Sequence, residues 1–558
     1  MKTKETAARL FVLFVLAVLT ASCQDKIQKA DLVITNAIIW TGNENEPRAE
    51  AMAISGDTIL SIGSSQKISE FIGKNTEIRD LSGKFVTPGF IDSHVHLLTG
   101  GFNLNSVQLR NAKTPAEFIQ KIESFAKTVP KGSWILGGDW DHENWSGELP
   151  TKEWIDGVTK DNPVFITRLD GHMSLANSIA LELAGVTNQT PDIDGGDIVR
   201  NTNGELTGLL KDNATDLIWR FVTEPTEEEK EQALMAAMKY LSSNGVTSVH
   251  HMSAAWHYLV LKKARANDKL ITRIYAMYPL SDWGNLKKEI DINGSGDNWL
   301  KIGGLKGFVD GSLGSHTAAF FDPYLDKSSD NGLFVTPIDS IYKFVKAADK
   351  EDFQVMIHAI GDKAIHNLLN TFEKIQKENG NKDRRFRVEH AQHISQNDIK
   401  RFSQLNVIPS MQPYHAIDDG RWAEKLIGSD RIKTTYAFKS LLDEQAKLVF
   451  GSDWFVAPPI PLMGIYAAVT RRTLDDKNPE GWVPEQKITA VQALIAYTKN
   501  AAYASFEEDI KGTLESGKLA DFVIISEDLT KVDPVRIKDL KILETYVGGK
   551  KVYDIQDH

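Results

Sequence analysis

Short apolar runs in this chain end in histidine, lysine or aspartate at five widely separated places. The terminal residues are, in order, His94 with His96, Lys306, His358, His390 and Asp453. Each run is brief and apolar, which is typical of a buried β-strand. In a parallel α/β barrel the strand ends surround one cavity, where the chemistry takes place. The order of these residues therefore predicts one metal site built from distant parts of the sequence.

Length and composition are those of a large globular protein. The chain has 558 residues, of which 42% are hydrophobic and 25% charged, so it is too long for one small domain. Its formal net charge of −11 argues against a nucleic-acid partner, which would need a basic surface. Nothing in the composition argues against a homo-oligomer.

The first residues have the pattern of an export signal. A basic start precedes an almost wholly apolar stretch, residues 10–22, that is too short for a permanent membrane span. Small residues stand directly before Cys23, the only cysteine. This resembles a bacterial lipoprotein signal, which implies removal of residues 1–22, lipidation of Cys23 and a membrane-anchored place in the cell envelope, on the periplasmic or cell-surface side. The alternative is an ordinary cleaved signal.

Short strands with alternating polarity occupy both ends of the chain. They are expected at residues 30–40, 51–62, 76–81, 518–525 and 542–553. Either set alone would expose an apolar face, so residues 23–84 and 511–558 are predicted to form one small β-sandwich domain. The alternative is two unrelated additions.

Alternating strands and helices fill the middle of the chain, residues 85–510. The eight expected strands match the count of a closed (β/α)8 TIM-like barrel and lie at residues 85–91, 246–249, 271–276, 300–309, 354–357, 386–388, 407–411 and 447–450. The first connection is far longer than an ordinary βα loop. We interpret residues 101–223, approximately, as a subdomain inserted over the barrel mouth.

The residues around His94 and His96 indicate what this histidine pair does. Side chains two residues apart on a strand point to the same side. Two neutral imidazoles, from His94 and His96, therefore suit zinc or a similar divalent ion. Residues 87–96 as a whole resemble the first-strand signature of the amidohydrolase superfamily.

Four later segments resemble one branch of that superfamily, amidohydrolase family 3, which includes the N-substituted formamide deformylases. They are residues 306–315, 358–362, 387–392 and 451–453, and the resemblance extends over about residues 31–553. It implies hydrolysis of a non-peptide C–N bond in a small amide by a metal-bridged hydroxide. Residues 137–141 and 170–178 in the insertion also match family segments.

The resemblance implies two divalent ions, with zinc as the expected metal. The implied ligands are His94, His96 and Asp453 for the buried ion, His358 and His390 for the exposed one, and a carboxylated Lys306 between them. An unmodified lysine ammonium has no lone pair for a metal, whereas a carbamate has. Asp453 is also the implied catalytic base.

Substrate-side candidates come mainly from the insertion. Trp140, His142 and His172 are the candidates there, and His316 stands where many relatives have arginine.

Three functions compete. The first is a metal-dependent hydrolase of a small amide, of the N-substituted formamide type. The second is a deaminase or cyclic amidase of the same superfamily, and Lys306 favours the first because mononuclear deaminases need no bridging lysine. The third is a non-catalytic, ligand-binding envelope lipoprotein. The presence of all the ligand candidates argues against the third.

Overall fold

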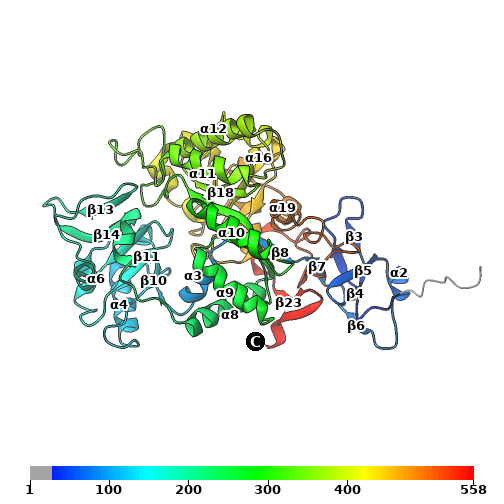
Figure 1. Ribbon diagram of the computed structural model, residues 1–558. Coiled ribbons are helices and arrows are strands. Elements are labelled where there is room, and N and C mark those ends of the chain that lie inside the picture. The colour runs from blue at the N-terminus through cyan, green and yellow to red at the C-terminus, as the bar shows by residue number, and fades with distance from the viewer. Residues whose placement is uncertain (1–27, 558) are drawn as a thin grey trace, which may run out of the picture.

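An eight-stranded parallel barrel lies at the centre of the computed structural model, which describes residues 28–557 (Figure 1). In hydrogen-bonded order its strands are β8 (Phe90–Val95), β15 (Val246–His251), β16 (Arg273–Pro279), β17 (Leu300–Phe308), β18 (Gln354–Ala359), β19 (Arg387–His390), β20 (Ile408–Met411) and β21 (Val449–Phe450). Chain order and spatial order agree, so each connection crosses to the neighbouring strand. The predicted α/β class and barrel are confirmed.

The barrel closes where the segment after β21 meets the end of β8. The Asp453 N–H donates to the His94 carbonyl at 2.7 Å, and the His96 N–H donates to the Trp454 carbonyl at 2.6 Å. Gly451 allows this approach, because a Cβ there would lie 2.6 Å from the His94 nitrogen. The closure therefore places the last predicted ligand beside the first two.

The first barrel strand differs from its expected position. Residues 85–91 divide between two sheets: β7 (Phe85–Pro88) pairs with strands of the chain ends, and the barrel strand begins at Phe90. The chain changes sheets at Gly89, where a Cβ would lie 2.2 Å from Thr247 Oγ1. A continuous apolar run hid this change, because both strands are buried.

Both chain ends contribute to one sheet beside the barrel. This six-stranded sheet joins β2 (Ile38–Trp40), β3 (Arg48–Ala49) and β7 to β22 (Phe522–Ile525), β23 (Ile542–Val547) and β24 (Lys550–Asp554). A four-stranded sheet contains β1 (Leu32–Thr35), β4 (Ala51–Ser55), β5 (Thr58–Gly63) and β6 (Glu77–Asp80). Apolar side chains from both sheets, such as Ile34 and Phe522, share one buried cluster. The sandwich form and the limits 23–84 and 511–558 stay predictions.

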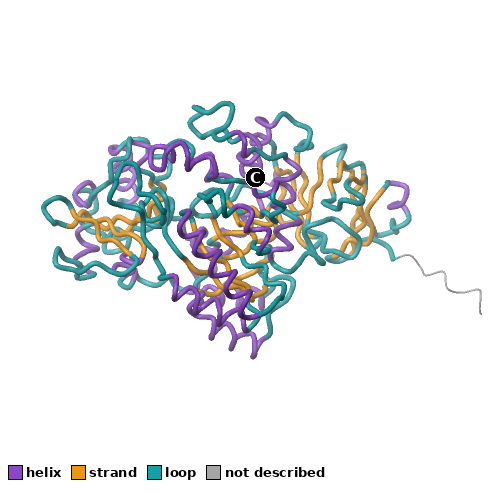
Figure 2. Tube along the Cα trace, turned by 90° about the horizontal axis from the view of Figure 1, so that it is seen from above, coloured by secondary structure: helices purple, strands orange, loops and turns teal. Residues whose placement is uncertain are grey.

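The long first connection forms a sheet of its own. Its six strands are β9 (Val107–Gln108), β10 (Gly137–Trp140), β11 (Phe165–Arg168), β12 (Met173–Ala176), β13 (Gly196–Arg200) and β14 (Leu206–Asp212). Helix α4 (Pro115–Ala126) buries Phe118 and Ile122 against it. The barrel lies between this sheet and the chain-end sheets (Figures 1 and 2). The limits 101–223 stay a prediction.

Helices between the strands cover the outside of the barrel (Figure 2). The main ones are α8 (Glu227–Ser243), α9 (Ala255–Ala266), α10 (Trp283–Asn293), α11 (Ile338–Lys350), α12 (Asp362–Asn379), α17 (Pro461–Thr470) and α18 (Ala490–Tyr497). In α8, a capping box at Thr226 and Glu229 starts the helix. Its buried residues Leu234, Met238 and Leu241 follow the helical repeat and face the barrel core.

The segment after β20 matters for the cavity described below. It contains α14 (Pro413–Asp419) and α15 (Ala423–Arg431).

The predicted export signal, residues 1–22, and Cys23 lie outside the described residues. Within residues 28–557, no helix has the length and apolar character needed to cross a membrane.

Candidate metal centre

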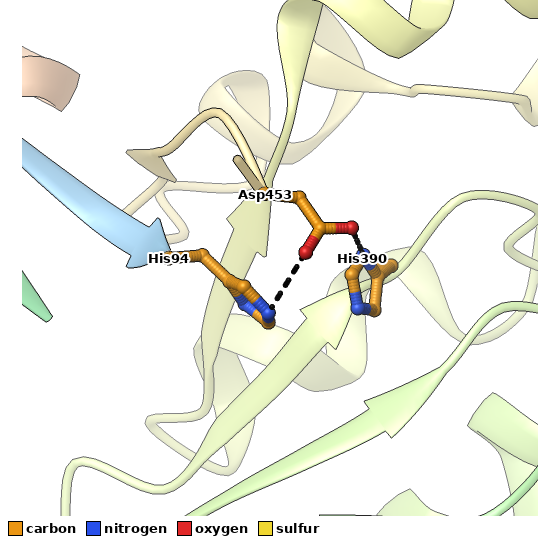
Figure 3. A group of neighbouring side chains, drawn as sticks. All are labelled: His94, His390 and Asp453. Atoms are coloured by element: carbon orange, nitrogen blue, oxygen red, sulfur yellow. Dashed lines mark ion pairs between the residues drawn. The ribbon is translucent and has the colours of Figure 1, made fainter. Parts of the chain in front are cut away.

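The predicted ligands converge at the carboxyl ends of the barrel strands. Figure 3 shows His94, His390 and Asp453 turned toward one another, and one ligand atom of each lies within 4.8 Å of the others. Asp453 Oδ1 is 3.4 Å from His94 Nε2 and 3.3 Å from His96 Nε2, and Asp453 Oδ2 is 3.9 Å from His390 Nδ1. The carboxylate thus lies among three imidazoles.

Lys306 and His358 complete the cluster. Lys306 is 5% exposed, and its Nζ lies 3.4 Å from His94 Nε2. The His358 ring is centred 4.4 Å from the His390 ring. His358 Nε2 is 3.0 Å from the Gly311 carbonyl, which can only accept, so Nε2 carries the hydrogen and Nδ1 is free to bind an ion. All six predicted ligands therefore lie in one place.

Burial keeps the imidazoles neutral. Loss of solvation holds the pKa of His94, His358 and His390 well below its usual value. The same effect lowers the pKa of Lys306 to about 8. Burial opposes charge on Asp453, whereas positive charge beside it, on His94 first, would lower its pKa. The site thus offers imidazole lone pairs around one carboxylate anion.

The donor atoms fit a divalent metal ion. Asp453 Oδ1 is buried and has no hydrogen-bond partner among the described residues. A buried acceptor left unpaired costs about 1–3 kcal/mol, and more when it is charged. A cation coordinated by this oxygen and by the imidazoles of His94 and His96 would remove that cost. Imidazole and carboxylate are common zinc ligands.

Two of the ligand candidates have unusual backbone conformations. His390 has φ +72° and Asp453 has φ +61°, both in the left-handed region. Such a conformation costs of the order of 1–3 kcal/mol and persists where the surroundings impose it, often at functional sites. His390 is the last residue of β19 and Asp453 lies three residues after the end of β21, so both stand at the ends of barrel strands.

Glu389 orients His94 from behind. The Nδ1–H of His94 donates to Glu389 Oε2, which also accepts from Ser410 Oγ at 2.8 Å. Arg387 Nε donates to Glu389 Oε1 at 2.7 Å, and both of these charged side chains are wholly buried. The carboxylate fixes the tautomer that presents Nε2 of His94 to the ion. Two opposite charges two residues apart, directly before a predicted ligand, were the signal for this pair, whose role was not predicted from the sequence.

His390 and His358 also have fixed partners. The Nδ1–H of His390 donates to Gln412 Oε1 at 2.9 Å, which leaves Nε2 for an ion. Asp310 lies 3.6 Å from His358 Nε2 and accepts three backbone N–H bonds, from residues 319, 360 and 361. Burial nevertheless raises the pKa of Asp310 to about 7.

A cavity adjoins the cluster. Besides His358, His390 and Asp453, its lining includes Asp141, Arg168, Asp170 and His172 from the insertion, residues 312–314 after β17, and His415, Asp418, Asp419 and Trp422 after β20.

Of the predicted substrate-side residues, His172 lines this cavity. Its Nδ1 is 2.6 Å from Asp212 Oδ1, and its ring is centred 4.9 Å from that of His358. His142 lies behind the wall, where its Nδ1 accepts from Arg168 Nε at 3.2 Å.

Trp140 and His316 do not line the cavity. Trp140 is wholly buried in the core of the insertion, where its indole packs edge-on against Phe118 and Nε1 donates to the Ile166 carbonyl at 3.0 Å. The large aromatic surface of Trp140 is stabilised by burial, which explains why the side chain lies in this core and not at the cavity. His316 has φ +57° and its Nε2 lies 3.2 Å from Asp326, so it binds within its own loop.

Arg168 is a residue of the cavity wall that was not predicted from the sequence. This side chain is 1% exposed; its Nη2 is 3.0 Å from Asp141 Oδ1 and its Nη1 is 2.6 Å from Asp170 Oδ2. The sequence feature that could have indicated Arg168 is the one that indicated the metal ligands. It is a charged residue at the end of an apolar run, here at the end of β11.

The chain belongs to the amidohydrolase family. The model of this family matches residues 77–553, which confirms the family 3 resemblance. "Protein LONG AFTER FAR-RED 3" of Arabidopsis thaliana is 42% identical over 94% of this chain and 92% of its own length. "Putative amidohydrolase YtcJ" of Bacillus subtilis (strain 168) is 31% identical over 92% and 98%.

Two further similarities bear on the activity. An "N-substituted formamide deformylase" of Arthrobacter pascens is 27% identical over 94% of this chain and 99% of its own length. The crystal structure of an uncharacterized metal-dependent hydrolase from Pyrococcus horikoshii is 31% identical, with a TM-score of 0.73 over 90% of this chain and 99% of that chain. The expectations of a hydrolase and of a divalent metal are confirmed.

We predict that Glu389→Gln weakens metal binding by about 10- to 100-fold, the usual effect of losing a carboxylate behind a metal-bound histidine. The amide keeps the shape but holds the His94 tautomer less strongly. Metal affinity measured by competition with a chelator checks this. Glu123→Gln, which changes a surface carboxylate paired only with Lys127, is the control. Unchanged metal affinity in Glu389→Gln would show that His94 needs no such support.

Proposed function

We propose that this amidohydrolase cleaves the non-peptide C–N bond of a small amide, with an N-substituted formamide as the substrate type. The observation that carries the proposal is the position of Lys306, 3.4 Å from His94 inside a cluster of imidazoles. A metal centre bridged by a modified lysine distinguishes amide hydrolysis from the mononuclear deaminase alternative. The similarity to an N-substituted formamide deformylase supports the substrate type.

The proposed centre holds two divalent ions, for which zinc suits the donors. Their ligands would be His94, His96 and Asp453 on one side, His358 and His390 on the other, and the carbamate of Lys306 between. When bound, such ions polarise an amide carbonyl and lower the pKa of water toward neutrality.

Asp453 is the proposed proton carrier. Its side chain lines the cavity beside the imidazoles, and its Oδ1 has no hydrogen-bond partner among the described residues. It would take the proton of the attacking water and deliver it to the leaving nitrogen as the C–N bond breaks. Water is thereby divided between the products, an acid and an amine. A formamide gives formate and the free amine.

Asp453→Asn tests this role. The amide keeps the shape and a ligating oxygen but is a poor base, so turnover should fall by at least roughly 10²-fold while much of the metal is kept. Hydrolysis of a panel of N-formyl and N-acyl amines, with elemental analysis of the same preparation, measures both. Asp291→Asn, at an exposed surface pair, is the control. Near-parental turnover with full metal would place the proton transfer on another residue.

Lys306→Ala tests the bridge. The variant should lose most of its metal and nearly all activity, because no other side chain of the site replaces the carbamate. Formate or acetate, which can fill the gap between the ions, should restore part of the activity. The same acids added to the parent enzyme are the control. An intact two-metal stoichiometry in Lys306→Ala would remove Lys306 from the centre.

We also propose that the enzyme is a lipid-anchored envelope protein, on the pattern of residues 10–23. Cys23→Ser should then lose the acyl chains and become soluble or remain unprocessed. Membrane fractionation together with mass spectrometry of the amino-terminal peptide measures both. If Cys23→Ser fractionates and migrates like the parent, the lipoprotein interpretation is wrong.

A further inference from the structure

The cavity wall beyond the metal cluster has more carboxylates than cations. Asp141, Asp170, Asp418 and Asp419 all line it, whereas the only arginine in the lining is Arg168. Arg421 adds a second guanidinium behind the wall, where its Nη2 contacts Asp418 and lies 3.1 Å from Asp141 Oδ2. Three of the four carboxylates thus pair with two guanidiniums and Asp419 pairs with neither, which leaves a formal excess of negative charge around the cavity.

Both guanidiniums are already engaged. Arg168 bridges Asp141 and Asp170 and also donates from Nε to His142. Arg421 bridges Asp141 and Asp418. His172, the other cationic candidate on the wall, is held by Asp212. Among the described lining residues, no cationic side chain stands without a carboxylate partner, so the wall offers little to an anionic substrate group.

Asp419 is the carboxylate with no cation beside it. Its Oδ2 accepts from the Tyr436 hydroxyl at 2.5 Å, and no described cation comes within ion-pair distance of it. Burial raises the pKa of Asp419 to about 7. A ligand cation beside it would favour the charged carboxylate again, so ligand and side chain would stabilise each other.

His415 is a second, independent feature of this wall that points to ligand binding. It lies on α14 with Asp418 and Asp419, is 8% exposed, and lines the same cavity. Its Nε2 is buried and has no hydrogen-bond partner among the described residues. Trp422, three residues after Asp419, adds an aromatic side chain to this wall. The face of an aromatic ring attracts a cation.

We propose that the substrate carries a protonated aliphatic amine beyond its scissile amide, and that Asp418 and Asp419 bind this ammonium beside Trp422. The inference rests on the proposed amide hydrolysis and specifies its substrate class. The metal cluster and the acidic wall line one cavity, so a short chain of carbon atoms would connect the two groups. Hydrolysis of such a formamide would release a diamine.

Three matched formamides test the charge preference in the metal-loaded enzyme. They are N-formyl-1,4-diaminobutane, its neutral analogue N-pentylformamide, and the anionic 5-formamidopentanoate. We expect kcat/KM for the ammonium compound to exceed that for the neutral one by about 10-fold or more, because a charge-assisted contact is lost in the neutral analogue. The anionic compound should be the poorest. Equal or higher kcat/KM for the neutral compound would overturn the proposal.

The variants Asp419→Asn and Asp418→Asn test whether these two carboxylates cause the preference for the cationic substrate. Each removes one negative charge with little change in shape, and each should reduce the ratio of kcat/KM between the ammonium and neutral substrates by several-fold or more. Asp430→Asn, whose carboxylate is 93% exposed on α15, is the matched control and should keep the parental ratio. A parental ratio in both cavity variants would also overturn the proposal.

A binding measurement separates this inference from the proposed reaction. The affinity of 1,4-diaminobutane for the metal-loaded protein is measured by calorimetry, with no turnover required. If none of the formamides is hydrolysed, the proposed function fails; diamine binding that weakens in Asp419→Asn but not in Asp430→Asn still supports the cationic site. Absence of diamine binding to the parent, or equal binding in all variants, rejects it.

Discussion

The contact between the last barrel strand and the first is the constraint on which the site depends. The hydrogen bond from the Asp453 N–H to the His94 carbonyl both closes the barrel and joins an anionic ligand to a pair of imidazoles. Gly451 permits that approach, since no larger residue fits against the backbone of His94. Barrel closure and metal binding are therefore one structural event, and a change that opens the barrel at this point disperses the ligands.

A buried layer of charge behind the ligands holds them in place. Arg387, Glu389 and Ser410 converge on His94 with little exposure to solvent. Burying a charge pair costs desolvation energy, which only good geometry and further hydrogen bonds offset. Here Arg387 and Ser410 bind Glu389, and Glu389 in turn determines where His94 Nε2 points. The energetic cost is consistent with a layer kept for orientation more than for stability.

The sequence predicted the strand-end residues well because a parallel barrel converts strand ends into neighbours whatever lies between them. His94, Lys306 and Asp453 needed no knowledge of the connections. Predicting the position of Trp140 did require such knowledge, because it depends on which face of β10 packs against α4. Arg168 also depends on how the insertion folds against the barrel. The division of residues 85–91 between two sheets depends on Gly89, whose requirement appears only when Thr247 is placed beside it.

The reacting groups and the groups that would select a substrate come from different parts of the chain. The metal ligands stand on strand ends of the barrel, whereas the acidic wall comes from α14 and from the loops of the insertion. Changes in those segments leave the strand ends in place, so one hydrolytic centre can serve different substrates within a fold. This separation explains why membership of the amidohydrolase family establishes a metal-dependent hydrolase but not its substrate. The substrate must be argued from the wall, where the physical evidence is the charge balance: Arg421 contacts Asp418, and Asp419 has no cation within ion-pair distance among the described residues.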